Sequence, residues 1–181
     1  MERDVAARFY KAIEAVLSMK LSEFMEKYRE LLPRFALVEE EMEMPKVLDL
    51  LRSGRHYIIV VDKKNRVKGI ISYIDFMLMF GRRRSTAMFA PFSSVSRSLR
   101  RSRMPYETLI GLSASDITTI LPPHLWTDSL VEDALKYMSS AGTNYAVVTT
   151  REGVVVGIVT AHAIFRAVLK EARFEDRNLD S

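Results

Sequence analysis

Two stretches of the chain share one order of apolar and polar positions. Each begins with a short extended segment, at 35–38 in the first stretch and at 120–126 in the second, and an amphipathic helical pattern follows. Two continuous apolar runs joined by a polar turn come next, HYIIVVDKKNRVKGIIS and NYAVVTTREGVVVGIVT. Such runs are typical of strands in a sheet that helices cover on at least one face. A second amphipathic segment closes each stretch, so the pattern predicts the order β-α-β-β-α twice and an α/β (α+β) fold.

A shift of 88 residues superposes the two stretches, which indicates a duplication. The pairs that match include two glycines and one hydroxyl residue in each copy: Gly54 and Gly142, Gly69 and Gly157, Ser72 and Thr160. The glycines lie 15 residues apart in both copies, with matching apolar positions between them. Two repeats are fewer than a solenoid needs, so we expect a duplicated small domain.

The first helix of the second copy is predicted from TDSLVEDALKYMSSAG. We expect Thr127 or Asp128 to be its N-cap and Gly142 to end it. In the first copy, the acidic run EEEME at 39–43 is interpreted as the solvated start of a helix, where acids suit the helix dipole.

Two further segments lie outside the repeats. Residues 2–19 are predicted to form an amphipathic helix with one apolar stripe, made of Val5, Phe9, Ile13, Val16 and Leu17. A connector rich in serine and arginine joins the two copies. The predicted division is an N-terminal helix, a first repeat, the connector, a second repeat and a tail, at 1–19, 20–80, 81–111, 112–175 and 176–181.

The composition is that of an ordinary globular protein, with 48% hydrophobic and 28% charged residues among 181. No apolar run reaches the roughly 18 residues of a membrane span, and the N-terminus lacks the apolar core of a signal peptide, so we expect a cytoplasmic protein. The chain has no cysteine, which excludes a disulfide framework and a thiolate metal site. The absence of glutamine indicates a thermophilic source.

The net charge of +4 is concentrated in one segment. Seven arginines and a single acid lie between Arg82 and Glu107, which gives +6 there and leaves −2 for the rest. Seven arginines among serines suit binding to nucleic-acid phosphates, docking to an acidic protein, or contact with the phosphates of a nucleotide. The alternative is a solvated loop that binds nothing. Charge density alone does not identify a partner.

The phrases YIIVVDKKNRVKGIISYID and YAVVTTREGVVVGIVTAHAIF carry a family resemblance. A duplicated β-α-β-β-α unit that ends in glycine, two apolar residues, serine or threonine, and an aspartate three positions later resembles the CBS (cystathionine β-synthase) domain. The resemblance covers 20–80 and 112–170 and is to a tandem pair, or Bateman module. It implies two repeats related by a pseudo-twofold axis, with two clefts that commonly bind AMP, ADP, ATP or S-adenosylmethionine. It also implies a homodimer formed through the CBS helices, and a sensor rather than a catalyst.

Asp75 matches the aspartate of that motif. A carboxylate accepts hydrogen bonds from both ribose hydroxyls, and Ser72 supplies a further hydrogen bond at the strand end. The alternative is that Asp75 merely caps the final helix of the first repeat, and the two roles are compatible.

The second copy departs from the motif, because Ala163 stands where the aspartate belongs. Thr160 keeps the hydroxyl of Ser72, and His162 is adjacent, although a helical neighbour points about 100° away. We therefore expect the second cleft to be the poorer adenosine site, with His162 on a helix surface or an interface.

Phosphates need positive charge, and Arg55 and His56 precede the apolar strand of the first copy. The resemblance implies that a basic residue here approaches nucleotide phosphates, and exposed turn residues are the alternative. Thr143, the counterpart of Arg55, is much poorer for that role. The adenine ring needs apolar walls, for which the candidates are Ala36, Leu37, Ile58 and Tyr145.

Catalysis finds little support in the sequence. The histidines at 56, 124 and 162 show no metal-binding spacing, and no nucleophile elbow or Walker loop occurs. We therefore expect a non-enzymatic sensor that needs no metal and binds an adenosine nucleotide, most simply AMP, ADP or ATP. S-adenosylmethionine is the alternative ligand, and a nucleic-acid-binding protein or a ligand-free interaction module is the alternative function.

Overall fold

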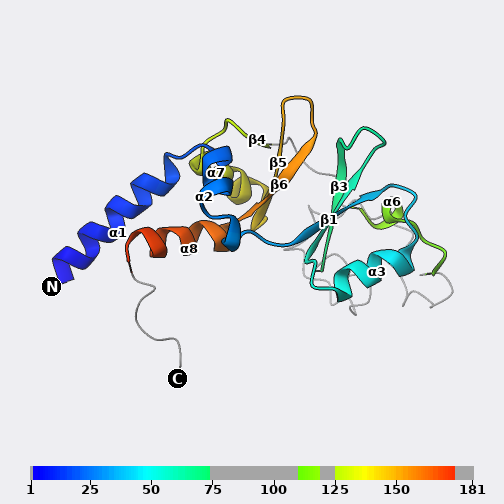
Figure 1. The fold of residues 1–181 in the computed structure, drawn as a ribbon, viewed down its shortest axis with the longest axis horizontal. Helices are drawn as coiled ribbons and strands as arrows, with labels where there is room; N and C mark the ends of the chain where they lie inside the picture. The colour runs from blue at the N-terminus through cyan, green and yellow to red at the C-terminus, as the bar shows by residue number, and fades with distance from the viewer. Residues whose placement is uncertain (1, 74–109, 119–124, 174–181) are drawn as a thin grey trace, which may run out of the picture. The chain divides into compact units, whose positions relative to one another are not determined.

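The computed structural model describes residues 2–73, 110–118 and 125–173. The chain forms two compact units, and each is described by itself (Figure 1). Unit 1 takes Met1–Pro33, His124–Arg151 and Val155–Ser181, and unit 2 takes Arg34–Pro123 and Glu152–Val154.

Unit 2 is built on a three-stranded sheet in the order β1-β2-β3. The strands are β1 (Phe35–Glu39), β2 (Tyr57–Val61) and β3 (Val67–Ser72); β1 runs parallel to β2, and β3 runs antiparallel to it. Two helices, α3 (Met44–Arg52) and α6 (Ala114–Ile117), cover one face. The core on that face contains side chains of all three strands and both helices: Val38, Met44, Val47, Ile58, Val60, Ile71, Ala114 and Ile117. The predicted order of the first copy is thus confirmed as far as β3.

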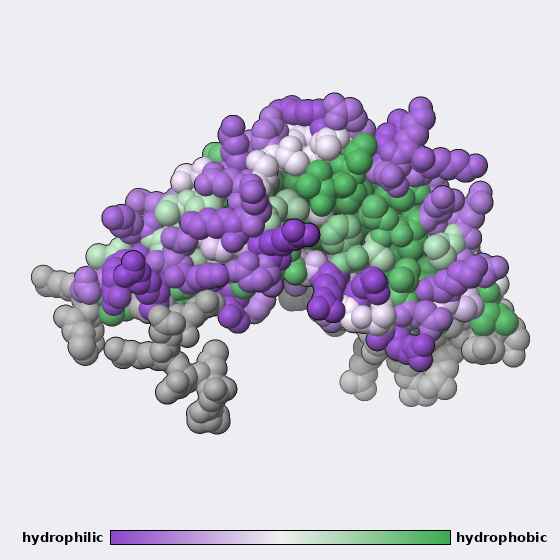
Figure 2. Space-filling view, viewed as in Figure 1, coloured by the Kyte–Doolittle hydropathy of each residue, from purple (hydrophilic) through white to green (hydrophobic). Residues whose placement is uncertain are grey.

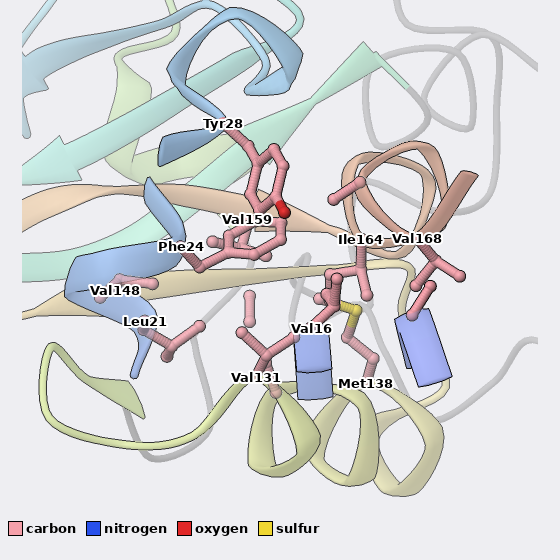
Figure 3. Close-up of a cluster of buried hydrophobic side chains, with 14 of the residues drawn as sticks. Val16, Leu21, Phe24, Tyr28, Val131, Met138, Val148, Val159, Ile164 and Val168 are labelled. Carbon is pink, nitrogen blue, oxygen red and sulfur yellow. The ribbon is translucent and has the colours of Figure 1, made fainter. Parts of the chain in front are cut away.

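Unit 1 repeats the same sheet with β4 (Leu125–Trp126), β5 (Tyr145–Thr149) and β6 (Val155–Thr160) in the order β4-β5-β6. Its helices are α1 (Glu2–Leu17), α2 (Leu21–Lys27), α7 (Val131–Ala141) and α8 (Ala161–Glu171), with a 3-10 turn η1 (Arg29–Leu31). Figure 3 shows the core that they share: Val16 of α1, Phe24 of α2, Met138 of α7 and Ile164 of α8 surround Val159 of β6. The β-α-β-β-α order of the second copy is confirmed.

The N-terminal helix packs along α7 and α8 of unit 1. Val16 is buried, and Phe9, Ile13 and Leu17 pack against the same core, as the apolar stripe predicts. Val5 is an exception, because its side chain is exposed.

Matching glycines end the first helix of each copy. Gly142 is the C-cap of α7, with φ 64°, and Gly54 follows the C-cap of α3 with φ 82°. This left-handed region is unfavourable for residues with a Cβ, so glycine is suited to both positions. The predicted stop at Gly142 is confirmed.

The predicted N-cap of α7 at Thr127 or Asp128 is wrong, because the N-cap is Leu130. The Asp133 carboxylate accepts the Leu130 N–H at 3.0 Å, so an acid inside the helix supplies the capping acceptor. Thr127 instead donates its N–H to the Thr149 carbonyl at 3.1 Å, which extends the β4–β5 pairing, and Asp128 forms an ion pair with Arg151.

The acidic run at 39–43 lies before the helix and not within it. Glu39 is the last residue of β1, and Glu43 is the N-cap of α3. Pro45 lies in the first turn of α3, where proline is tolerated because the N–H that it lacks would have no partner within the helix.

The short helix that precedes each repeat packs with the strands of the other repeat. In unit 1, Leu21 of α2 donates its N–H to the Ser129 carbonyl at 2.8 Å. In unit 2, Ala114 of α6 donates its N–H to the Met42 carbonyl at 2.8 Å. Each compact unit therefore combines residues of both repeats: α2 lies in unit 1 with the strands of the second repeat, and α6 lies in unit 2 with the strands of the first.

Candidate functional site

One end of the unit 2 sheet gathers basic and polar residues from three strands. In the register of the sheet, Phe35, Tyr57 and Ser72 form one row. Arg34 and His56 stand one position before this row, and the His56 N–H donates to the Arg34 carbonyl at 3.2 Å. We call Arg34, Arg55, His56 and Ser72 the basic end of unit 2.

The basic side chains of this end are accessible. Arg34 and His56 are exposed, and Arg55 is half-buried. The Arg55 Nη1 donates to Ser53 Oγ at 2.5 Å, and Ser53 Oγ donates to the Leu50 carbonyl at 2.7 Å, so Arg55 is held against the end of α3. Guanidinium groups bind phosphates and carboxylates through charged hydrogen bonds, and the arrangement therefore suits an anion.

Ser72 and Tyr57 lie side by side in the buried part of this end. Ser72 is buried, and Tyr57 is its partner in the register of β2 and β3. Burial, and then the neighbouring Tyr73, raises the pKa of the Tyr57 phenol. The phenol consequently stays neutral at physiological pH and able to donate a hydrogen bond.

The apolar candidates of unit 2 divide between the two faces of its sheet. Ile58 is completely buried in the core against α3, and Ala36, its register partner, packs against that same core. Leu37 lies on the opposite face and is 42% exposed. Figure 2 shows an apolar area over the part of unit 2 that carries β1 and β3. Leu37 and Ile58 therefore lie on opposite faces of the sheet and cannot both contact one ligand.

The corresponding end of unit 1 has the same framework with neutral residues. Tyr145 pairs with Thr160 as Tyr57 pairs with Ser72. Asn144, which corresponds to His56, accepts the Ala161 N–H on its carbonyl at 2.9 Å. The Thr143 hydroxyl donates to the Tyr145 carbonyl at 2.9 Å, so its proton is engaged by the backbone of this turn.

The start of α8 shows what the second copy does at the position of the motif aspartate. The N-cap is Thr160, whose hydroxyl oxygen accepts the Ala163 N–H at 3.1 Å. Ala163 is completely buried, whereas His162 is exposed. A hydroxyl residue at the strand end is thus sufficient to cap this helix.

Several predicted features lie outside the described residues. They are Asp75, the helix expected after Ser72, and the arginines between 82 and 103. Within the ranges that the structure describes, no group of three or more histidines, cysteines and acids is placed to hold a metal ion. No helix in these same ranges has the length and apolar character needed to cross a bilayer.

Arg34 and Tyr57 were missed as candidates on the sequence. Helical or strand periodicity shows which residues share a face, but it does not show which residues of two strands are neighbours. The signal for Tyr57 was available, because the shift of 88 residues places it on Tyr145. Arg34 has no such signal, since its place follows only from the pairing of β1 with β2.

In the part of the chain that the structure describes, a β-α-β-β unit occurs twice, with two matching sheets and similar strand ends. The family model "CBS domain" matches residues 22–81 and 114–170, and the chain belongs to the CBS domain family.

Solved structures agree with this fold. The CBS domain of a CBS-domain-containing membrane protein from Sphaerobacter thermophilus is similar, with 22% identity, 90% of this chain and 95% of that chain covered, and a TM-score of 0.62. A CBS domain protein from Pyrobaculum aerophilum, complexed with AMP, has 17% identity, coverage of 86% and 99%, and a TM-score of 0.57.

A third similar structure is the cytosolic domain of the Mg²⁺ channel MgtE in complex with ATP. It shares 24% identity over 74% of this chain, with a TM-score of 0.50, and the match spans 45% of the MgtE domain. No curated protein is similar enough in sequence to count as a relative.

Proposed function

We propose that this chain is a cytoplasmic regulatory module that binds an adenosine nucleotide, AMP, ADP or ATP, at the basic end of unit 2. Binding would change its affinity for a partner or its oligomeric state, and the module would act as a sensor and not as a catalyst. The proposal is supported most by one observation: Arg34 and His56 are hydrogen-bonded neighbours at the sheet end where Ser72 lies.

The phosphates are assigned to Arg34, Arg55 and His56. Guanidinium groups form charged hydrogen bonds with phosphate oxygens, which are stronger than neutral ones. The equivalent positions of unit 1, Thr143 and Asn144, carry no charge. Nucleotide binding is therefore proposed to be asymmetric, with unit 2 contributing the stronger phosphate contacts.

The ribose is assigned to Asp75 and Ser72. The first turn of α8 supports a functional role for Asp75, because Thr160 alone caps that helix and Ala163 occupies the aspartate position. If Ser72 caps the corresponding helix in the same way, the Asp75 carboxylate is available to accept the ribose hydroxyls. The alternative is a capping box, in which the acid accepts the N–H of Ser72.

The adenine ring is assigned to the face of unit 2 that carries Leu37. Leu37 is exposed there and lies in one row with Ile59 and Ile70, which are buried. Ala36 and Ile58 are on the other face, so they support the sheet in this proposal and do not touch the base.

Two of the similar structures support the ligand class, since one was solved with AMP and another with ATP. We also propose that the module forms a homodimer through its helices, as is expected from the family.

The test is a mass spectrum of the small molecules released when the freshly purified protein is denatured. The proposal expects an adenosine nucleotide in the released fraction of the wild type and much less from an Asp75→Ala variant. If no nucleotide is released, a thermal-shift series with AMP, ADP, ATP and S-adenosylmethionine follows. An unchanged melting temperature with all four ligands would rule the proposal out.

A further inference from the structure

Trp126, the only tryptophan of the chain, is exposed at the end of β4 in unit 1. Its exposed fraction is 41%, and that of Leu130, four residues later, is 37%. In the register of unit 1, Trp126 pairs with Thr149, the last residue of β5. In unit 2, Glu39 pairs with Val61, the last residue of β2, so Glu39 is the counterpart of Trp126. Glu39 is an exposed acid, and the fold therefore does not require an apolar residue at this position.

The turn after β4 holds Trp126 in place. The Trp126 carbonyl accepts the Ser129 N–H at 3.0 Å, and the Trp126 N–H donates to Ser129 Oγ at 3.3 Å. The first and fourth residues of such a turn lie within about 7 Å of each other, so Leu130 follows Trp126 closely in space. The start of α2 supports the turn, because the Ser22 N–H donates to the Thr127 carbonyl at 2.9 Å.

Arg151 and Asp128 complete the surface around Trp126. The central carbon of the Arg151 guanidinium lies 4.1 Å from the centroid of the indole ring, which is the geometry of a cation–π contact. Arg151 Nη2 also donates to Asp128 Oδ2. This hydrogen bond, and to a smaller extent the charge of Lys20, lowers the pKa of the Asp128 carboxyl. The Arg151 and Asp128 side chains remain 60% and 50% exposed. We call Trp126, Asp128, Leu130 and Arg151 the tryptophan patch.

The tryptophan patch has the chemistry of a protein contact. Tryptophan and arginine are enriched among the residues that dominate binding energy at interfaces, and side chains that are fixed before binding lose less entropy. The four residues carry no net charge, and the guanidinium is already paired. Even with Lys20 beside it, the surface lacks the density of positive charge that nucleic acid requires. A surface with apolar residues and one charge of each sign can instead match a copy of itself about a twofold axis.

We propose that the tryptophan patch binds the same patch of a second copy of the chain, with the two Trp126 rings in contact and Arg151 of each copy beside Asp128 of the other. This contact is separate from the homodimer proposed through the helices, and it needs no nucleotide. Four residues are far fewer than the roughly 20–30 residues a side of a standard interface, so the contact is weak and reversible.

Trp126 reports on this contact directly, because all the tryptophan emission of the protein comes from it. As the wild type is concentrated from about 1 to 500 μM, the emission should shift to the blue, together with a rise in the sedimentation coefficient. For Arg151→Ala, the midpoint of this change should lie at a concentration at least about tenfold higher. Tyr10→Ala is the matched control, since Tyr10 is an aromatic residue of the same unit with 71% exposure, and the variant should keep the full shift.

Two results of this measurement would overturn the proposal. One is a wild-type emission maximum that does not move with concentration. The other is a shift that Arg151→Ala and Tyr10→Ala leave equally unchanged, because the contact would then lie elsewhere.

An exchange of charges tests whether the patch meets itself. Arg151→Glu gives the patch two acids and Asp128→Lys gives it two bases, so each variant should repel its own copies. An equimolar mixture brings opposite charges together and should associate at least about tenfold more tightly than either variant alone. A mixture that associates no more tightly than the separate variants would show that the patch does not bind itself, even if the wild type forms dimers.

These results do not depend on the proposed function. All the titrations are made without nucleotide, so a failure of nucleotide binding leaves the tryptophan patch standing. An emission that does not change with concentration removes the patch and leaves nucleotide binding untouched.

Discussion

At the scale of single residues, Arg34 and His56 acquire a common role from the register of two parallel strands. Neither residue is part of a sequence motif, yet one backbone hydrogen bond places them together at an exposed sheet end. The guanidinium groups of Arg34 and Arg55 distinguish this end from the corresponding one in unit 1, where Thr143 takes the position of Arg55 and Asn144 that of His56. The proposed preference for phosphate rests on this difference.

Arg34→Ala is expected to weaken ATP binding about tenfold, because a charged hydrogen bond contributes about 1.5 kcal/mol or more. The weakening should be smaller for AMP, which has fewer phosphates, and should shrink as salt is added. Arg52→Ala is the matched control, since Arg52 is an exposed arginine of unit 2 paired with Asp49 at 3.3 Å. Calorimetry in which both variants behave alike would remove Arg34 from the site.

Asp75→Ala is expected to weaken nucleotide binding by about 1.5–3 kcal/mol if the carboxylate accepts the ribose hydroxyls. A 2′-deoxy nucleotide should bind the wild type more weakly than the ribonucleotide, and this difference should disappear in the variant. If the variant loses thermal stability but keeps its affinity, Asp75 acts as a helix cap alone.

At the scale of elements, the duplication explains why so much of the fold was predictable. The two copies share one pattern of strands and helices, and the strands in the described part of the chain lie within a few residues of where they were expected. The N-cap of α7 was missed, because Asp133 inside the helix takes the role that Thr127 or Asp128 was expected to fill. The exchange of α2 and α6 between repeats was also missed, since no periodicity encodes which sheet a short helix covers.

Gly54→Ala is expected to lower the free energy of unfolding by about 1 kcal/mol. The φ of 82° is unfavourable for alanine, and nothing lies within 4 Å of an added Cβ, so the cost is conformational strain alone. Gly54→Asn should cost less, because asparagine tolerates this region. Denaturation curves in which alanine and asparagine are equally harmless would contradict the role assigned to this glycine.

Two contacts of Glu171 predict a pH dependence for unit 1: the Tyr28 hydroxyl donates to Glu171 Oε1 at 2.5 Å, and Lys27 Nζ lies 2.7 Å from the same oxygen. The pKa of Glu171 is lowered in the folded state, so its stabilising contribution is complete above the unfolded pKa and is lost as pH falls through the folded one. The free energy of unfolding of the wild type should therefore fall between about pH 5 and pH 3 more steeply than that of Glu171→Gln. Parallel curves for the two proteins would show that Glu171 contributes nothing.

The phenol of Tyr28 extends the same argument to alkaline pH. Burial, followed by the hydrogen bond to Glu171, raises its pKa to about 12. A raised folded pKa means that the contribution is present below the unfolded value near 10 and is lost as pH rises toward 12.

At the scale of the whole molecule, the two units share one fold but carry different functional residues. Both have the sheet, the tyrosine beside a hydroxyl residue, and the glycine at the end of the first helix. Unit 2 carries the basic end, and unit 1 carries the additional helix α1 and the contacts of Glu171 with Tyr28 and Lys27. The sequence could predict the family and the asymmetry at Ala163, whereas the place of Arg34 beside His56 and the contact of Tyr28 with Glu171 join residues that are distant along the chain.

The most direct test of the central claim is the stoichiometry of nucleotide binding by calorimetry, with AMP and ATP titrated into the wild type. We predict saturable binding with one strong site per chain, and we expect Asp75→Ala and Arg34→Ala each to lower the affinity of that site. No saturable heat with either nucleotide, or two equal sites per chain that both survive these substitutions, would contradict it.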